Sequence, residues 1–357
     1  MNTKHTLFNK SSCDLPEIKN ESVALIVTSP PYPIIEMWDE SFKSQLDNYT
    51  KKIPSDLYLY FEEMHKILDR VWKEMYRVLI PGGIMCVNIG DATKTINNKF
   101  CLYSNHSRIL SYCISLGFDN LPNIIWRKQT NAPNKFMGSG MLPVGAYVTL
   151  EHEYILIFRK GAKREFKNET EKQIRRESAF FWEERNVWFS DIWNFNGTSQ
   201  RIKNIESRNR SGAFPFELPY RLINMYSVKG DTVLDPFLGT GSTMLAAMSS
   251  ERNSIGVEID KEYIEHIKSS IDDYTHIQLN DYLEKRIMNH IGFVNECNIN
   301  HNKLNSVNKQ FGFKVKSSQE ADIRINYLNK ITKSGDFEYS VSYSEPKYEQ
   351  SILSCSD

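Results

Sequence analysis

The sequence predicts an α/β protein with a doubly wound, mostly parallel sheet, because strand and helix patterns alternate in two separate stretches. In the first stretch, residues 20–160, an apolar run at 23–27 precedes a helical pattern of apolar residues over 58–79. That pattern ends at a Pro-Gly-Gly turn, residues 81–83, of the kind that stops helices. The same alternation returns over residues 216–281. Repeated βαβ units of this kind place parallel strands side by side.

The remaining predicted elements keep this rhythm in chain order. Strands are expected at 84–89, 123–126, 154–158, 232–234 and 254–259, and helices at 107–116 and 242–248. Residues 161–212 break the rhythm, since charges are dense there and aromatic residues are interleaved with them. From about residue 284 the chain is polar and shows little periodicity except at 323–331.

Composition narrows the class of protein. The chain has 357 residues, 40% hydrophobic and 25% charged, and no apolar run of the roughly 20 residues that a membrane span needs. The polar start of the sequence lacks the apolar core of a signal peptide. Its six cysteines form no CxxC pair and no cluster with histidines, which indicates reduced thiols and no metal site. We therefore expect a cytoplasmic protein that contacts no membrane.

The first informative segment directly follows the strand predicted at 23–27. It reads Ser29-Pro30-Pro31-Tyr32, and another proline comes next. Prolines restrict the backbone, so this loop is stiff. A rigid surface turn or a proline-rich ligand motif would explain such a segment taken alone. Its position at the end of an apolar strand favours a functional loop.

The second informative segment is a glycine-rich turn between a strand and a helix. Gly239 and Gly241 allow a sharp turn and a close approach to a ligand. A phosphate-binding P-loop is excluded because Ser242, not lysine, follows the last glycine. A dinucleotide fingerprint would need a small residue where Met244 stands. An ordinary strand–helix turn is the remaining simple explanation.

The acidic residues around this turn indicate what it binds. Asp235, at the end of the preceding strand, would repel a pyrophosphate but attract an amine or another cation. Glu258 and Asp260 end the next strand about twenty residues later, where a carboxylate suits the hydroxyls of a ribose. A nucleoside that carries positive charge fits both features. S-adenosylmethionine is such a ligand, with its amino acid near Asp235 and its adenosine near Glu258.

Together the two motifs resemble a known family, the DNA methyltransferases that modify exocyclic amines, in the permuted beta arrangement. In that family a [DNS]-P-P-[YFW] motif precedes the target-recognition region and D-P-F-x-G-x-G-[ST] follows it. This chain has SPPY at 29–32 and DPFLGTGST at 235–243, in that order. The segments at 79–91, 123–128, 152–160 and 214–223 also look like family segments, so the resemblance covers roughly residues 8–275.

The resemblance implies a Rossmann-like methyltransferase fold and a set of site residues. Ser29 and the Pro30 carbonyl would accept hydrogen bonds from the target amine, and the ring of Tyr32 would stack on a flipped-out base. The implied catalytic set is Ser29, Pro30, Pro31 and Tyr32. The implied cofactor set is Asp235, Pro236, Phe237, Gly239, Gly241, Ser242, Glu258, Asp260, Phe214 and Phe216. Family members often carry an aspartate near the adenine, where this chain offers Ser11, Ser12 or Asp14.

The permuted arrangement also implies a division of the chain. Residues 1–160 would form the catalytic half, 161–211 a target-recognition insert, 212–283 the cofactor half and 284–357 an extension of unassigned role. Candidate contacts to double-stranded DNA are Arg127, Lys128, Arg175, Arg176, Arg201 and Lys203. Three tryptophans of the insert are expected to form local core: Trp182, Trp188 and Trp193.

The serine at position 29 favours cytosine N4 as the target, since adenine N6 enzymes more often carry aspartate or asparagine there. Adenine N6 methylation is the alternative on the same fold. Methylation of protein glutamine or RNA is disfavoured because an Asn-Pro-Pro-Tyr motif is usual there. A catalytically inactive DNA-binding regulator is the alternative of another class. The expected setting is a type II restriction-modification system with a companion endonuclease, the methyltransferase acting as a monomer or a homodimer.

Overall fold

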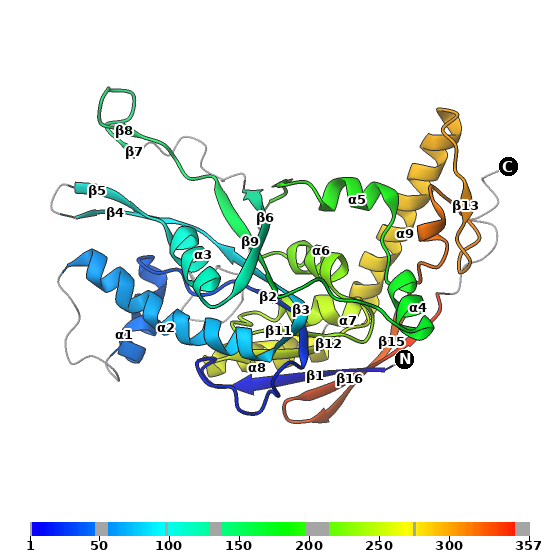
Figure 1. The fold of residues 1–357 in the computed structure, drawn as a ribbon, viewed down its shortest axis with the longest axis horizontal. Helices are drawn as coiled ribbons and strands as arrows, with labels where there is room; N and C mark the ends of the chain where they lie inside the picture. Colours follow the sequence, from blue (N-terminus) through cyan, green and yellow to red (C-terminus); the bar gives the residue numbers. More distant parts are fainter. Residues whose placement is uncertain are drawn as a thin grey trace.

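The computed structural model describes residues 2–46, 56–96, 99–128, 137–196, 214–273 and 276–346. Its centre is a ten-stranded sheet with the order β10-β6-β9-β3-β2-β11-β12-β1-β16-β15 (Figure 1). Five neighbouring strands in the middle run parallel: β3 (Leu79–Ile89), β2 (Val23–Thr28), β11 (Thr232–Asp235), β12 (Asn253–Glu258) and β1 (Asn2–Asn9). The predicted α/β class and parallel core are confirmed.

Antiparallel pairs flank the parallel strands on both sides, which the βαβ rhythm did not predict. On one side, β9 (His152–Lys160) lies antiparallel between β3 and β6 (Phe118–Arg127), and β10 (Ile192–Asn194) pairs parallel with β6. In its described part, the connection from β6 to β9 contains only a short hairpin and no crossover helix. Parallel neighbours need a long crossover, so this connection suits an antiparallel pair.

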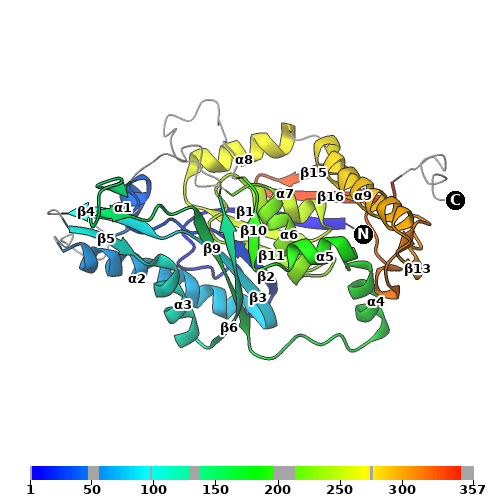
Figure 2. The same cartoon turned by 90° about the horizontal axis from the view of Figure 1, so that it is seen from above.

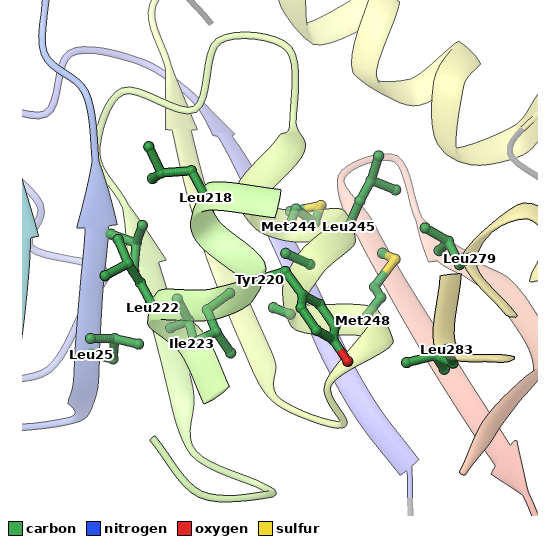
Figure 3. Packing of buried hydrophobic residues seen from close by; sticks show 14 of the residues in the cluster. Leu25, Leu218, Tyr220, Leu222, Ile223, Met244, Leu245, Met248, Leu279 and Leu283 are labelled. Carbon is green, nitrogen blue, oxygen red and sulfur yellow. The ribbon is translucent and has the colours of Figure 1, made fainter. Parts of the chain in front are cut away.

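Helices cover both faces of the sheet. On one face α2 (Leu57–Val78) and α3 (Asn105–Ser115) bury their apolar sides, and Asp56 caps α2 by accepting hydrogen bonds from two backbone N–H groups. The other face carries α6 (Glu217–Tyr226), α7 (Ser242–Ser249) and α9 (His276–Ile299). Figure 2 shows α2 and α3 on the opposite side of the sheet from α7, and Figure 3 shows leucines of α6, α7 and α9 packed together.

Shorter elements complete the molecule. They are η1 (Glu36–Trp38), α1 (Asp39–Leu46), β4 (Ala92–Ile96), β5 (Lys99–Tyr103), β7 (Met137–Gly138), β8 (Ala146–Tyr147), α4 (Glu169–Glu177), α5 (Trp182–Trp188), α8 (Lys261–Asp273), β13 (Ser306–Val307), β14 (Lys314–Val315), η2 (Ser318–Glu320), β15 (Tyr327–Gly335) and β16 (Glu338–Ser344). None of the helices in these described ranges has the length and apolar character of a membrane span.

The region after residue 284 is integrated with the rest of the chain. The expected boundary at 284 falls inside α9, and β16 pairs antiparallel with β1 and extends the central sheet. Helix α9 also supports the insert, because Arg286 Nη2 donates to Glu184 Oε2 at 2.8 Å. His290 Nδ1 lies 2.7 Å from Glu183 Oε1 on the same short helix, α5. The C-terminal region therefore braces both the sheet and part of the insert.

The tryptophans of the insert divide between core and surface. Trp188 and Trp193 are buried, as predicted. Trp182 is 44% exposed, so the expectation that it forms local core was wrong. Its position as the first residue of α5 explains this, because its backbone N–H donates to Glu320 while the side chain stays at the surface.

Candidate active site

The two predicted loops lie side by side at the carboxyl edge of the parallel strands. Strands β2 and β11 pair directly, with Leu25 opposite Val233 and Ile26 opposite Leu234. The loop with SPPY follows β2, and the loop with DPF follows β11. In open α/β sheets, ligands bind beyond the carboxyl ends of the strands. The fold therefore places both motifs where a ligand is expected.

A cavity opens between these loops, and most of the predicted cofactor residues line it. It is lined by Ser11, Ser12, Cys13, Ser29, Pro31, Trp38, Phe42, Gln45, Ile67, Leu68, Val71, Phe214, Pro236, Phe237, Leu238, Gly239, Thr240, Ser242, Val257, Glu258, Ile259 and Tyr263. The lining from η1, α1, α2 and α8 was not predicted, because apolar residues on those helices carry no motif. Within 11–14, Ser11, Ser12 and Cys13 line the cavity, and Asp14 does not.

Asp235 holds the loop predicted to bind the cofactor, residues 235–241 (the cofactor loop), but its own side chain does not line the cavity. Its carboxylate is 1% exposed. Oδ1 accepts from Thr28 Oγ1 at 2.7 Å and from the Phe237 N–H at 3.0 Å, and Oδ2 accepts from Thr243 Oγ1 at 2.6 Å. Burial raises the pKa of Asp235 to about 6, although these hydrogen bonds oppose the rise. The arrangement supports a role in holding the loop, rather than the direct contact to a cationic ligand that the sequence suggested.

The glycines have the backbone conformation that the turn requires. Gly239 and Gly241 have φ values of +54° and +88°, in the left-handed region that favours glycine. Gly241 directly precedes α7, and a Cβ there would come within 3.3 Å of the Ile267 side chain. Gly239 and Ser242 line the cavity, whereas Gly241 shapes the turn behind it.

Glu258 is the carboxylate that reaches the cavity. Its Oε2 accepts from the Gly239 N–H at 2.8 Å, and Oε1 accepts from the Asp260 N–H at 2.9 Å. Burial raises its pKa to about 7. Asp260, by contrast, stands outside the lining and accepts from the Glu262 N–H at 2.8 Å, at the start of α8. The structure therefore makes Asp260 a helix cap, and the cofactor contact predicted for it has no support here.

The two phenylalanines predicted to contact the cofactor have different environments. Phe214 lines the cavity. The ring of Phe216 instead packs on Tyr220, with centroids 5.5 Å apart, and on Tyr282, at 4.8 Å. Residue 216 precedes α6 and belongs to the core formed by α6 and α9. Its predicted cofactor role does not match this position.

The cavity has the chemistry that S-adenosylmethionine requires. Apolar side chains form most of its walls, and Glu258 offers a carboxylate to ribose hydroxyls. Thr240 also lines it, and the buried Oγ1 of this residue has no hydrogen-bond partner among the described residues. An unpartnered buried hydroxyl costs free energy, which a polar group of a ligand would recover. Ser12 closes one side by donating to the Pro236 carbonyl.

The loop predicted to be catalytic, residues 29–33 (the catalytic loop), is held by residues of strands outside the SPPY motif. The Tyr32 hydroxyl donates to Glu153 Oε2 at 3.0 Å and lies 3.1 Å from Ser29 Oγ. Asn88 Nδ2, from β3, donates to the same hydroxyl at 3.0 Å and to Glu153 Oε2 at 2.6 Å. Sequence reasoning missed Asn88 and Glu153; the only signal was that each lies in a segment that looks like the family. One edge of the Tyr32 ring lies against Gly90, where a Cβ would be 3.0 Å away.

The predicted DNA contacts fall in two places. Arg127 and Lys128 follow β6 at the edge that carries the catalytic loop; Arg127 pairs with Glu151 at 3.2 Å, and Lys128 donates to Glu153. Arg175 and Arg176 line a different cavity, together with Ala24 and Gly82. This cavity lies toward the amino-terminal ends of β2 and β3, away from the carboxyl ends that carry the catalytic loop. The structure does not bring the two pairs together. Arg201 and Lys203 lie outside the described residues.

Comparisons with known proteins agree with this site. The family model described as DNA methylase, N6/N4 type, matches residues 23–269. The chain is similar to the type II methyltransferase M.MthZI of Methanothermobacter thermautotrophicus, at 49% identity over 98% of both chains. It is also similar to the type II methyltransferase M.MjaI of Methanocaldococcus jannaschii, at 50% identity over 72% of this chain and 88% of that one.

A solved structure shares the fold. TTHA0409 of Thermus thermophilus, solved in complex with S-adenosyl-L-methionine, is 32% identical over 74% of this chain and 93% of that chain, with a TM-score of 0.57. S-adenosylmethionine, the cofactor predicted from the sequence, is the methyl donor of the family. The family model covers more than half of the chain and the relatives span most of it, so the chain belongs to the N6/N4 DNA methylase family.

Proposed function

We propose that this chain transfers a methyl group from S-adenosylmethionine to the exocyclic N4 amine of cytosine in double-stranded DNA. The observation that carries the proposal is that Ser29, the first residue of the SPPY loop, lines the same cavity as Glu258 and Thr240. A base that enters beside Ser29 would therefore meet the cofactor in one continuous space. Inside a duplex the base cannot reach this cavity, so it must be flipped out at a cost of a few kcal/mol.

The chain's own residues would prepare the amine for attack. The lone pair of an exocyclic amine is delocalised into the ring, which makes the amine a poor nucleophile. Hydrogen bonds from its N–H groups to Ser29 Oγ and the Pro30 carbonyl would favour the geometry in which this lone pair is available. Pro30 and Pro31 hold these acceptors in place, which lowers the entropic cost at the moment of reaction. S-adenosylmethionine supplies the electrophilic methyl group and would leave as S-adenosylhomocysteine, and the methylated amine would release one proton to water. The amine itself is the nucleophile, so no enzyme nucleophile is needed.

Cytosine is proposed over adenine because of the side chain at position 29. Aspartate or asparagine is more frequent there in adenine enzymes, as the resemblance to the family implies. A serine is shorter, and its hydroxyl lies against Tyr32 at 3.1 Å. The proposal rests on this residue, since both bases present an amine of the same kind.

Identification of the methylated nucleoside tests the proposal. The purified protein is incubated with tritiated S-adenosylmethionine and duplex DNA, and the DNA is digested to nucleosides and analysed by mass spectrometry. We expect N4-methylcytosine, and we expect the Ser29→Ala variant to lose most activity while it still binds the cofactor. N6-methyladenine as the product would contradict the assignment of the base, and a complete lack of transfer to any duplex would favour the inactive DNA-binding regulator.

The similarity to type II methyltransferases also suggests the biological role of this protein. Two similar proteins carry the name type II methyltransferase. We propose that this chain protects host DNA against a companion restriction endonuclease. DNA methylated to completion by this protein should then resist that nuclease, whereas DNA incubated with the Ser29→Ala variant under the same conditions should be cut.

A further inference from the structure

A chain of hydrogen bonds runs from Lys128 to the cavity and ends at Ser29. Lys128 Nζ donates to Glu153 Oε1, and its ammonium also lies 4.3 Å from the centroid of the Trp126 ring. Glu153 Oε2 accepts from the Tyr32 hydroxyl at 3.0 Å. That hydroxyl lies 3.1 Å from Ser29 Oγ, on the wall of the cavity. Lys128 directly follows β6, Glu153 lies in β9, and Tyr32 and Ser29 lie in the catalytic loop, so the fold brings these groups together from distant parts of the sequence.

The carboxylate decides the direction of every bond in this chain. An ionised carboxylate can only accept hydrogen bonds, and bonds to it are stronger than those between neutral groups. The single hydrogen of the Tyr32 hydroxyl is therefore directed at Glu153. Burial and the neighbouring Glu153 raise the pKa of Tyr32 well above its usual value, so the phenol keeps this hydrogen.

Asn88 follows the same rule. Its Nδ2 group lies 2.6 Å from Glu153 Oε2 and 3.0 Å from the Tyr32 oxygen, so the amide must present hydrogens to both. The opposite orientation would place the amide oxygen against a carboxylate. Asn88 is 2% exposed, so its amide is shielded from bulk water, which could otherwise replace these partners. The orientation of the amide is thus set by Glu153 as well.

The consequence for Ser29 follows from its neighbour. Because the Tyr32 hydrogen is committed to Glu153, the Tyr32 oxygen has no hydrogen for Ser29 and can act toward it only as an acceptor, as it does toward Asn88. The hydroxyl hydrogen of Ser29 then points to Tyr32. Asn88 Nδ2 lies 3.5 Å from Ser29 Oγ and occupies at most one of its lone pairs, so the serine keeps an acceptor position for the cavity side. An aspartate at this position would be an acceptor in every orientation. A serine can donate or accept, so it needs a neighbour that fixes its direction.

We propose that Glu153 is a positioning residue that acts through Tyr32 to hold Ser29 as a hydrogen-bond acceptor for the exocyclic amine of the target base. The inference rests on the role proposed above for Ser29, and it adds residues that lie outside both sequence motifs. A purely structural explanation exists for Glu153, as the counter-ion of Lys128. The two explanations differ in what they predict for the uncharged variant.

Replacement of Glu153 by glutamine keeps its shape and reverses the chain. The amide oxygen of glutamine would face the Lys128 ammonium, which leaves the NH2 group facing Tyr32. The Tyr32 oxygen would then accept from residue 153, and its hydrogen would lose the acceptor that holds it away from Ser29. The amide of Asn88, which faces the same atoms, would also lose the carboxylate that orients it. Ser29 would therefore lose the neighbour that fixes its direction, and its own hydrogen would be free to point at the amine, where two donors meet.

The experiment measures single-turnover methylation of one duplex with cofactor and DNA at saturation. We expect Glu153→Gln to slow the step by about 10- to 100-fold, which corresponds to the loss of one charge-assisted hydrogen bond. The affinity for S-adenosylhomocysteine should stay within about twofold, because Glu153 stands outside the lining of the cofactor cavity. The matched control is Glu265→Gln, which removes an exposed carboxylate paired with Lys268 at 2.9 Å and should not slow the step.

A double-mutant cycle with Ser29→Asn separates positioning from structure. The carbonyl of asparagine accepts without help from Tyr32, so Glu153→Gln should cost less than about threefold in that background. An equal cost in both backgrounds, or a cost no larger than that of Glu265→Gln, would overturn the inference. If Glu153→Gln does not fold, Tyr32→Phe removes the same relay and should show the same dependence on Ser29.

The outcome is independent of the identity of the base. Both candidate amines donate N–H groups to Ser29, so the cycle reads the same way for cytosine and for adenine. The nucleoside analysis of the same reactions reports which base is modified. A product of N6-methyladenine with an intact cycle would overturn the proposed target base and leave the role of Glu153 standing.

Discussion

The loops after β2 and β11 begin alike, with a polar residue followed by proline, yet they are held in different ways. In the cofactor loop, Asp235 is fastened by its own loop, by the start of α7 and by the last residue of β2. In the catalytic loop, Ser29 and Tyr32 depend on Asn88 of β3 and Glu153 of β9. One loop is held largely by its own motif, and the other is held by the fold.

This difference separates what each motif can explain. The partners of Asp235 include Phe237 and Thr243, two and eight residues away, so the motif DPFLGTGST contains most of the fastening. The hydroxyl of Tyr32 is held by Glu153, 121 residues away. A substitution in the cofactor loop should therefore change the loop itself, whereas a substitution in β9 can change catalysis with no change in either motif.

The largest effect is expected when the fastening at Asp235 is removed. Asp235→Ala leaves two buried hydroxyls and one backbone N–H without their acceptor, which should lower the free energy of unfolding by about 2–3 kcal/mol and weaken cofactor binding. Urea unfolding and calorimetry measure the two effects. The Asn variant is the informative control, because its side chain can bond to all three partners without a charge.

The sign of the Asp235→Asn effect follows from the pKa. Burial raises the pKa of Asp235 in the folded protein to about 6, so the folded state favours the protonated carboxyl. The stability that this group contributes is fully present below its pKa in the unfolded chain and is lost as pH rises through 6. At pH 8 the Asn variant should be at least as stable as the wild type. Its affinity for the cofactor should stay within about threefold of the wild type, because the side chain stands outside the cavity lining. A much larger loss of affinity would instead make Asp235 a counter-charge to the cofactor.

A smaller effect is expected from the titration of Glu258, which reaches the cavity. Its pKa is raised to about 7 by burial, so it is mostly protonated at pH 6 and mostly ionised at pH 8. If the carboxylate accepts from ribose hydroxyls, affinity for S-adenosylhomocysteine should rise about tenfold over this interval, since one proton is released on binding. Calorimetry in the Asp235→Asn background isolates this titration. A flat profile there, or an equal rise in Glu258→Gln, would contradict the role.

Much of the fold and the cofactor site could be predicted because their signals are local. The strand–loop–helix pattern around Gly239 and Gly241, and the carboxylate after the next strand, are short-range features that the structure reproduces. Phe216 and Asp260 show the limit of such reasoning. Phe216 lies two residues after the lining residue Phe214, and Asp260 directly follows the lining residue Ile259. The direction of each side chain nevertheless places Phe216 against Tyr220 in the core and Asp260 at the start of a helix.

Long-range features could not be predicted from these patterns. Strand β9 pairs antiparallel with β3, and β16 pairs antiparallel with β1; no motif links either pair of segments. The sequence therefore showed neither the residues that hold Tyr32 nor the pairing of the C-terminal region with the central sheet. Charged residues are the weakest case. The sequence shows that an arginine carries a positive charge, but the fold determines how far that arginine lies from the catalytic loop.

The smallest effect is expected from substitution of the arginines. These substitutions compare Arg127, near the catalytic loop, with Arg175 and Arg176, near the other end of β2. Arg127 stands opposite His152 in the β6–β9 pair, one residue from Glu153 and so near the catalytic loop. Its ion pair with Glu151 is exposed and contributes little, which leaves it available to a phosphate. Arg175 and Arg176 line a cavity with Ala24 and Ile84, at the other end of β2, which spans about 20 Å.

A duplex that presents a base to Ser29 should therefore contact Arg127 and not the Arg175–Arg176 pair. We expect Arg127→Ala to lower the slope of log affinity against log salt by about 0.9, the value for one phosphate contact. The double alanine variant of Arg175 and Arg176 should leave the slope unchanged, and Glu151→Gln is the control for loss of the ion pair. Fluorescence anisotropy over a salt series measures all three. A slope that falls by about 1.8 in the double variant would place α4 on the DNA after all, as the sequence alone suggested.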